Sequence, residues 1–332
     1  MATAETAESG AGYGGAEAAH RPPAESPTDL PAGAWKDTLK RTVQEFREDG
    51  LTDWAAALTY YAILSIFPAL IVLLSILGLI GPSATQPLID NLETVAPGPA
   101  QQIFTNAIRD LQHSQGAAGI LLVAGLLLAL WSASGYIGAF TKAANVVWDV
   151  EEGRPAWQTI PLRIGLTILL LLLTVLTSVG VVLSGGLADQ VGNLLGVGDT
   201  AVTVWNIAKW PVIVLLVSLM FSILYYATPN VRQPSFRWVT PGGVLAVLLW
   251  ILSSAAFAVY LANFGSYNKT YGTLGGVIAI MVWLWITNIV VLLVAELNAE
   301  IERGRQIEAG LSGRREPEPF LPPRREAEKD EP

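Results

Sequence analysis

The chain has 332 residues, of which 52% are apolar and 14% are charged, so it has too little charge to cover a soluble globule of that length. Its formal net charge of -8 excludes a nucleic-acid binder that depends on a basic surface. The absence of cysteine excludes disulfides, thiolate metal sites and cysteine nucleophiles.

The first 50 residues divide into a tail and a helix. Residues 1–33 are rich in Ala, Gly, Glu and Pro and have few large apolar side chains, so we expect a disordered cytoplasmic tail. Residues 34–50 show the three-to-four-residue apolar spacing of an amphipathic helix. Its apolar stripe consists of Trp35, Leu39, Val43 and Phe46. We expect this helix to lie on the membrane surface.

Six apolar stretches each contain at least the ~20 residues that a hydrocarbon core requires. They cover residues 57–80, 117–141, 160–185, 204–228, 239–263 and 272–295. Together they predict an all-α, polytopic membrane domain over residues 51–303, with the lipid bilayer as its partner. Protein partners are not indicated by the sequence, and assembly into a homo-oligomer stays open.

The distribution of cations predicts the orientation of this domain. If both termini are cytoplasmic, 17 of the 20 Lys and Arg residues lie in cytoplasmic segments. The three that remain outside are Arg109, Lys209 and Lys269. This positive-inside bias predicts six spans in the plasma membrane with both termini in the cytoplasm.

The segments outside the spans also have recognisable patterns. The loop after the first span contains two short apolar stripes separated by Pro97, Gly98 and Pro99, which predicts two short amphipathic helices. Residues 304–332 are rich in Pro, Glu and Arg, so we expect a second disordered cytoplasmic tail.

Catalytic motifs are scarce. The two histidines, His20 and His113, lie in a tail and in a loop, so no imidazole pair has metal-ligand spacing. The acidic cluster of Asp149, Glu151 and Glu152 has the oxygen ligands that a divalent cation prefers, but Arg154 follows at once and favours surface ion pairs instead. We therefore predict no enzyme activity, no cofactor and no metal.

Polar side chains within the spans are more informative, because they are costly at membrane depth and commonly line a cavity or join helices. In the first span they precede Pro68, whose ring bends the helix, so this span is a candidate gate, with helix packing as the alternative. The predicted cavity-lining residues are Tyr60, Tyr61, Ser65, Asn145, Tyr225, Asn230, Tyr260, Tyr271 and Asn288.

Glu296 follows six apolar residues, so its carboxylate is expected at the inner membrane interface, where an unpaired charge is costly. One interpretation is a proton or cation site. The other, which we favour, is a salt bridge to Lys142, Arg163 or Arg232. Glu296 and Arg232 are our candidate inner gate or ion pair.

Several large and small residues within the spans are expected to serve packing. Trp131, Trp250 and Trp283 lie near the middle of their spans and are expected to fill the core. Gly272 and Gly276 have the spacing of a close helix contact.

Six segments together resemble the family of bacterial inner-membrane proteins called YihY or virulence factor BrkB, once named ribonuclease BN. They are ALTYYAILSIFP (57–68), NVVWDVEEGRPAW (145–157), YYATPNVR (225–232), YNKTYGTLGG (267–276), VWLWI (282–286) and AELNAE (295–300). The resemblance spans about residues 35–303. It implies a polytopic plasma-membrane protein without an agreed activity, with links to envelope resistance and to export of lipids or other amphiphiles.

Our leading functional hypothesis is a transporter or translocase of a small or amphiphilic solute, including lipid-like ones. The alternative is a non-transporting envelope scaffold or resistance factor, and a membrane-embedded hydrolase is a third. A wet cavity near the midplane would favour transport, and a dry packed interior would favour the scaffold. The sequence disfavours a ribonuclease, because it has neither an acid and histidine pair nor a basic groove.

Overall fold

A computed structural model describes residues 32–80, 115–182, 199–233, 236–263, 273–308 and 323–325. These residues form α1 (Ala32–Glu48), α2 (Leu51–Ile80), α5 (Gln115–Val147), α6 (Ala156–Val182), α8 (Asp199–Ala227), α9 (Phe236–Asn263) and α11 (Thr273–Glu308). Apart from an isolated bridge between Val231 and Pro323, the described residues contain no β structure. The all-α prediction is confirmed for this part of the chain.

Each predicted apolar stretch coincides with one long helix, because uninterrupted apolar runs satisfy their backbone hydrogen bonds within a helix. Counted over the described residues, five helices are long and apolar enough to cross a membrane: α5, α6, α8, α9 and α11. The remaining one, α2, has 30 residues, which at 1.5 Å per residue is about 45 Å of helix. The count of six spans therefore stays a prediction.

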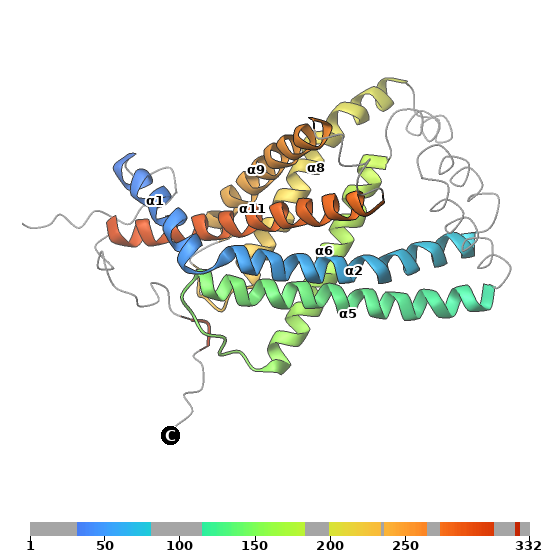
Figure 1. Cartoon of the computed structure of the whole chain (residues 1–332), viewed down its shortest axis with the longest axis horizontal. Helices are drawn as coiled ribbons and strands as arrows, with labels where there is room; N and C mark the ends of the chain where they lie inside the picture. The colour runs from blue at the N-terminus through green and yellow to red at the C-terminus, as the bar shows by residue number, and fades with distance from the viewer. Residues whose placement is uncertain are drawn as a thin grey trace, which may run out of the picture.

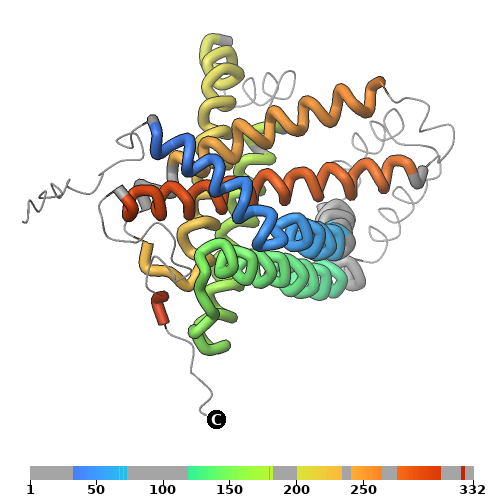
Figure 2. Tube along the Cα trace, turned by 60° about the vertical axis from the view of Figure 1, so that its left-hand side comes forward, coloured from blue at the N-terminus to red at the C-terminus, as the bar shows by residue number. Residues whose placement is uncertain are grey.

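The helices form one bundle with α1 at one end. Figure 1 shows α2, α5 and α11 running along the long axis, and α2 contacts both of the others. The remaining spans follow as a chain of contacts, from α5 to α6, α8, α9 and back to α11. Figure 2 shows α1 lying across α11, and a turn at Gly50, which has a φ of 61°, leads from α1 into α2. We call the end that contains α1, the start of α2 and the end of α11 the α1 end.

Packing is uneven along the bundle. Fully buried side chains, such as Leu58, Phe140 and Leu292, come from the half of each helix that lies toward the α1 end. In the other half, large apolar side chains such as Leu127 and Leu252 are exposed, as in a surface that contacts lipid. The bundle is therefore closed by a packed core near the α1 end.

The first helix, α1, packs against α11 with its polar face. Thr38 and Thr42 are buried, whereas Leu39 and Val43 on the predicted apolar stripe are about half exposed. The helix predicted for residues 34–50 is confirmed with slightly different bounds. Its exposed apolar edge leaves the predicted location on the membrane surface as a prediction.

The three mid-span tryptophans do not share one environment. Trp131 is 80% exposed, so the prediction that it fills the core is wrong. Trp250 and Trp283 pack together with ring centroids 6.1 Å apart. Their indole N–H groups donate to Thr287 and Ser254, both at 3.2 Å, so these two residues join α9 to α11.

Close helix contacts occur at glycines other than the predicted pair. A Cβ at Gly276 would meet no atom within 4 Å, so the close contact predicted there is absent from the described residues, and Gly272 lies outside them. By contrast, a Cβ at Gly138 on α5 would lie 2.5 Å from Cζ of Arg163 on α6. At Gly243 it would lie 2.4 Å from a carbonyl oxygen of α8. Gly243 therefore lets α9 approach the backbone of α8 closely, whereas Gly138 leaves room on α5 for the guanidinium of Arg163.

The predicted tails lie mostly outside the described residues, as do the two short helices predicted in the first loop. At the C-terminus α11 continues to Glu308, beyond residue 304, where the tail was predicted to begin. Residues 323–325 also contact the bundle through residues 230 and 231, although their composition predicted disorder.

Candidate functional site

Asn288 on α11 joins three helices in the packed half of the bundle. Its side chain is 2% exposed. Its Oδ1 accepts a hydrogen bond from the Tyr136 hydroxyl of α5 at 2.8 Å, and its Nδ2 donates to the Thr59 hydroxyl of α2 at 3.0 Å. Since both ends of this buried amide have partners, Asn288 here seals the core and does not line an open space.

Tyr225 makes the next polar contact toward the α1 end. The hydroxyl group of this buried side chain of α8 donates to the carbonyl of Val291 on α11 at 2.9 Å. Its ring stacks on that of Phe221, with centroids 6.2 Å apart. Tyr225 therefore fastens α8 to α11 less than one turn beyond Asn288.

A cavity of about 10 Å³, room for about one water molecule, lies beside Tyr225. Its lining residues are Ala144, Trp148, Tyr225, Gln233, Ala295 and Asn298. Among the described residues, nothing pairs with Oε1 of Gln233 or with Nδ2 of Asn298. Asn298 fits here because Gly242 has no side chain, as a Cβ there would lie 2.1 Å from Oδ1 of Asn298. One unpaired atom accepts and the other donates, so together they suit a water molecule.

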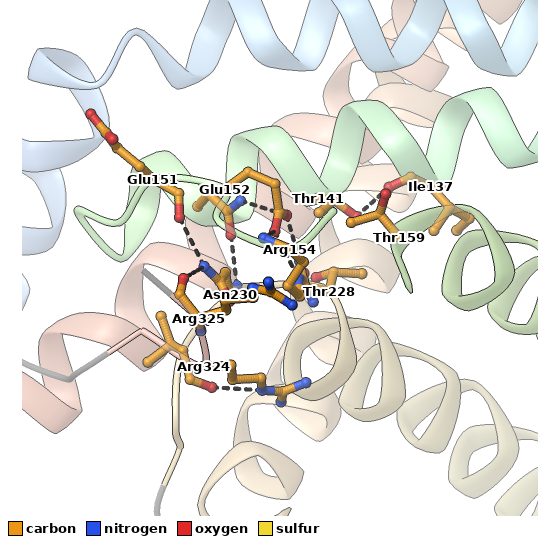
Figure 3. A network of polar contacts seen from close by, with 12 residues as sticks. Ile137, Thr141, Glu151, Glu152, Arg154, Thr159, Thr228, Asn230, Arg324 and Arg325 are labelled. Carbon is orange, nitrogen blue, oxygen red and sulfur yellow. Dashed lines mark hydrogen bonds and ion pairs between the residues drawn. The ribbon is translucent and has the colours of Figure 1, made fainter. Parts of the chain in front are cut away.

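Two asparagines join the loop after α5 to the loop after α8, as Figure 3 shows around Asn230. Asn145 accepts a hydrogen bond from the Asn230 backbone N–H at 2.7 Å and donates to Glu152 at 3.1 Å. Asn230 is fully buried, and its Nδ2 donates to the Glu151 carbonyl at 2.9 Å. These predicted lining residues therefore act as fasteners between loops.

The acidic cluster in the first of these loops forms ion pairs, as the sequence favoured. Arg154 pairs with Glu152 at 2.6 Å and donates to the Thr228 carbonyl at 2.8 Å. Burial alone would raise the pKa of Glu152, but the hydrogen bonds from Arg154 outweigh it and the pKa is lowered. Asp149 ends α5 with a φ of 51° and pairs with Arg303 at 2.7 Å.

Glu296 is the most unusual residue at the α1 end. Its side chain is 1% exposed, and no donor in the described part of the chain reaches its Oε2. The charged groups that act on it include three carboxylates, from Asp49, Glu300 and Glu45, and one guanidinium, from Arg303. Glu296 is therefore a buried carboxyl group in a mainly acidic environment, which is costly at membrane depth.

Glu300, one turn further along α11, has the same burial but a full set of partners. It is 1% exposed and pairs with Arg41 of α1 at 2.5 Å and with Arg303 at 3.2 Å. Arg303 also contacts Glu45 at 3.4 Å and Asp149 at 2.7 Å. This network connects α1, the end of α5 and α11.

The carboxyl groups around this network have raised pKa values. Burial, assisted by the nearby charges of Asp149 and Glu45, raises the pKa of Asp49 to about 7. Burial also raises the pKa of Glu45 and of Asp149, and Arg303 partly opposes the increase in both. The acidic groups at this end therefore differ in how readily they bind a proton.

The three predicted cationic partners of Glu296 have other environments. Arg163 donates to the Ser134 carbonyl on α5 at 3.0 and 3.2 Å, while Lys142 and Arg232 are exposed. No ion pair of Glu296 occurs among the described residues, so the favoured salt bridge and the gate formed with Arg232 are absent there. Arg163 binds a backbone carbonyl because α5 has a glycine where the guanidinium lies.

The remaining predicted lining residues do not gather with these. Tyr60 and Tyr260 are 59% and 47% exposed, so they lie on the surface of the bundle. Tyr61 packs against Gly135, where a Cβ would lie 3.0 Å from its ring, and the Ser65 hydroxyl donates to the Tyr61 carbonyl at 2.9 Å. Tyr271 lies outside the described residues.

The sequence reasoning missed Gln233, Asn298, Glu300 and Asp49. A signal for one of them was present, because Glu300 follows Glu296 by four residues and so shares its helix face. Within the described residues no three His, Asp or Glu side chains are placed to hold a metal ion. What the α1 end offers is a buried network of carboxyl groups, arginines and amides.

Most of the chain matches known proteins. The family described as virulence factor BrkB matches residues 42–319. A putative ribonuclease-like protein, YfkH of Bacillus subtilis (strain 168), is 31% identical over 253 residues, which are 76% of this chain and 90% of that protein. A UPF0761 membrane protein of Azoarcus sp. (strain BH72) is 28% identical over 288 residues, which are 82% of this chain and 66% of that protein. No solved structure matches.

Proposed function

This chain belongs to the virulence factor BrkB family, as its motifs predicted, and we propose that it is a transporter or translocase of a small or amphiphilic solute, including lipid-like ones. It is an integral membrane protein. Transport is our proposal for its role, and we place it in the plasma membrane with the α1 end on the cytoplasmic side.

The observation that carries this proposal is the buried carboxyl group of Glu296 where the bundle is sealed. Among the described residues, no donor reaches its Oε2, while Gln233 and Asn298 line a cavity with room for about one water. A buried group without a partner destabilises the closed arrangement by about 1–3 kcal/mol. Opening this end to water would satisfy the Glu296 carboxyl group, so the seal is of the kind that can open.

The uneven packing supports the same proposal. The contacts that seal the α1 half are interhelical hydrogen bonds such as those of Asn288 and Tyr225, whereas large apolar side chains in the other half are exposed, as on a surface that contacts lipid. A bundle sealed in its α1 half fits one state of an alternating-access cycle. Four of the predicted lining residues are buried in this half, and they would line the route only after the α1 end opens. They are Asn145, Tyr225, Asn230 and Asn288.

For orientation, we infer that six spans cross the membrane with both termini inside. The cation bias of the sequence supports this, with 17 of 20 Lys and Arg residues on the proposed cytoplasmic side. The described cations Arg41, Arg154 and Arg303 all contact residues of the α1 end, which supports assigning that end to the cytoplasm.

Reconstitution tests the proposal directly. Liposomes that contain the full chain and a nitrobenzoxadiazole-labelled phosphatidylethanolamine should lose more fluorescence to external dithionite than protein-free liposomes, because label from the inner leaflet reaches the outside. Entrapped carboxyfluorescein serves as the leak control and should be retained. Glu296→Gln should change the rate of lipid movement several-fold. If folded protein moves neither the lipid nor a small-solute probe, the transport proposal fails.

One observation favours the scaffold as a second candidate. The core around Phe140, Leu292 and Val294 is fully buried, and the cavity beside Tyr225 holds about one water. A dry, packed interior suits a scaffold that organises partner proteins and transports no solute, because it provides no route for one. Absence of flux, together with recovery of one stoichiometric partner after crosslinking in membranes, would establish this alternative.

We do not propose a ribonuclease role, although one relative is named putative ribonuclease-like. The net charge of -8 disfavours an RNA-binding surface. Purified protein should therefore cleave RNA no faster than a mock purification.

A further inference from the structure

The C-terminal residues 323–325 lie against the loop that follows α8 (Figure 3). The Arg324 backbone N–H donates to the Asn230 carbonyl at 2.9 Å, and Nδ2 of Asn230 donates to the Arg325 carbonyl at 2.7 Å. The Arg325 backbone N–H donates to Oδ1 of Asn230 at 3.2 Å. These bonds and the antiparallel bridge between Val231 and Pro323 give this segment a defined register.

The side chain of Arg324 occupies a site built from backbone carbonyls. Its Nε donates to the Val231 carbonyl and its Nη2 to the Tyr226 carbonyl, both at 2.9 Å. Its Cζ lies 5.6 Å from the centre of the Tyr226 ring. Because α8 ends at Ala227, the Tyr226 carbonyl belongs to the last turn of the helix, where the negative end of the helix dipole attracts a cation.

The planar guanidinium suits this geometry better than an ammonium would. Two of its N–H groups reach two carbonyls in different directions while its face covers an aromatic ring. Burial and the nearby Arg154 lower the pKa of Arg324, yet an arginine stays protonated in a protein. The site therefore recognises a charged arginine.

We propose that the C-terminal turn of α8 and the loop through Gln233 form a binding site for an arginine within an extended segment, and that residues 323–325 of the same chain are its ligand and act as a strap. The family match ends at residue 319, so this ligand lies beyond the part of the chain that the family accounts for. The proposal rests on the docked contacts and holds whether or not the chain transports a solute.

The strap has a mechanical consequence because of where its arginine binds. The carbonyls of Tyr226 and Val231 stand at the two ends of the turn that connects Tyr225 to Gln233. Both Tyr225 and Gln233 line the cavity, and Nε2 of Gln233 donates to the Tyr225 carbonyl at 3.0 Å. Arg324 therefore holds one wall of the cavity in place, and its release should admit water.

The neighbouring arginine provides a matched control. Arg325 contributes its backbone to the docked segment, but its side chain is exposed. Arg325→Ala thus removes the same charge as Arg324→Ala, one residue away, while leaving the docked guanidinium intact. A purely electrostatic effect of the tail would affect both variants equally.

Docking can be measured by disulfide formation, because the full chain has no cysteine of its own. Val231→Cys with Pro323→Cys places two thiols at directly opposed positions, about 4.5–5.5 Å apart at Cα, within the range that a disulfide spans. Crosslinking should be rapid in this background and with Arg325→Ala. It should be about tenfold slower with Arg324→Ala, since charge-assisted bonds are lost.

Equal crosslinking rates in the three backgrounds would overturn the arginine site. If Arg324→Ala does not yield folded protein, Arg324→Lys takes its place, and a lysine that crosslinks as fast as arginine overturns the site equally.

The effect of the strap on the cavity can be measured by labelling Ala144→Cys, which is a small change in a buried residue that lines the cavity. A maleimide probe should label it about tenfold faster with Arg324→Ala than with Arg325→Ala, in line with the expected loss of docking. Equal labelling rates would overturn the strap while leaving the arginine site standing.

Discussion

Glu296 and Glu300 form a natural pair for a stability experiment. They lie one turn apart on α11, and both side chains are 1% exposed. Glu300 has two arginine partners, whereas in the described structure no donor reaches Oε2 of Glu296. Replacing each by glutamine keeps the size and removes the acid, so the two variants differ only in what the carboxyl group was contacting.

The structure predicts a loss of stability for Glu300→Gln and no loss for Glu296→Gln. Glu300→Gln loses charge-assisted bonds to Arg41 and Arg303, each worth about 1.5–3 kcal/mol at most. Since Arg303 keeps Asp149 and Glu45, and the side chain of Arg41 is 26% exposed, we expect a net loss of roughly 1–3 kcal/mol. Glu296→Gln loses no ion pair, and its amide N–H groups suit the surrounding carboxylates. We expect stability to stay equal or to rise by up to about 2 kcal/mol.

Thermal unfolding of the purified chain in detergent, followed by tryptophan fluorescence, measures both changes. At roughly 2–4 °C per kcal/mol, Glu300→Gln should lower the melting temperature by several degrees, and Glu296→Gln should not lower it. A fall for Glu296→Gln as large as that for Glu300→Gln would refute the reasoning, because it would require a cationic partner for Glu296 that the described residues do not show.

Three further predictions use the same protein. Because the folded pKa of Asp49, about 7, lies above its unfolded value, the folded chain holds an extra proton between about pH 4 and pH 7 and loses stability as pH rises across that window. The melting temperature of Asp49→Asn should therefore be higher than that of the wild type at pH 8 and equal to it near pH 4. The charged groups that act on the Asp49 carboxyl are Glu45, Glu48, Asp149, Glu296 and Arg303. A higher melting temperature for Asp49→Asn only at low pH would contradict the predicted direction. Gly242→Ala should cost about 1–3 kcal/mol by displacing Asn298, whereas Gly276→Ala, in open space, should be neutral or slightly stabilising; equal melting temperatures would show that α9 and α11 do not need close contact. Tags at Met1 and Pro332 should both resist external protease in intact cells, and an accessible tag would overturn the proposed orientation.

The helices were predictable because each depends on a local pattern. Long apolar runs and the three-to-four-residue spacing before them specify that α1 and each long helix exist, without knowledge of any neighbour, although α11 continues well beyond its predicted end at residue 295. The polar residues to examine were also predictable in part. Asn145, Tyr225, Asn230 and Asn288 are buried and join segments far apart in the sequence.

What those residues contact was not predictable, because a partner depends on how a helix is rotated and on what packs against it. Tyr60 and Tyr61 are neighbours of the same type, yet one is mostly exposed and the other packs on α5. The environment of Glu296 comes from Asp49, just after α1, and from Glu45 within it, which lie 247 and 251 positions away in the chain. Residues 323–325 dock largely through backbone groups, which composition does not reveal.

The contact between Arg163 and α5 limits how this sequence can change over evolution. The guanidinium fills the space beside Gly138 and donates to a backbone carbonyl, which no substitution of a side chain can remove. Alanine at position 138 would therefore displace the guanidinium from its place beside α5, whereas a small residue at position 163 would leave a gap beside the glycine. The two positions should vary together among relatives, so that a side chain at 138 accompanies loss of the arginine. Their joint pattern would reveal which relatives keep this crossing of α5 and α6.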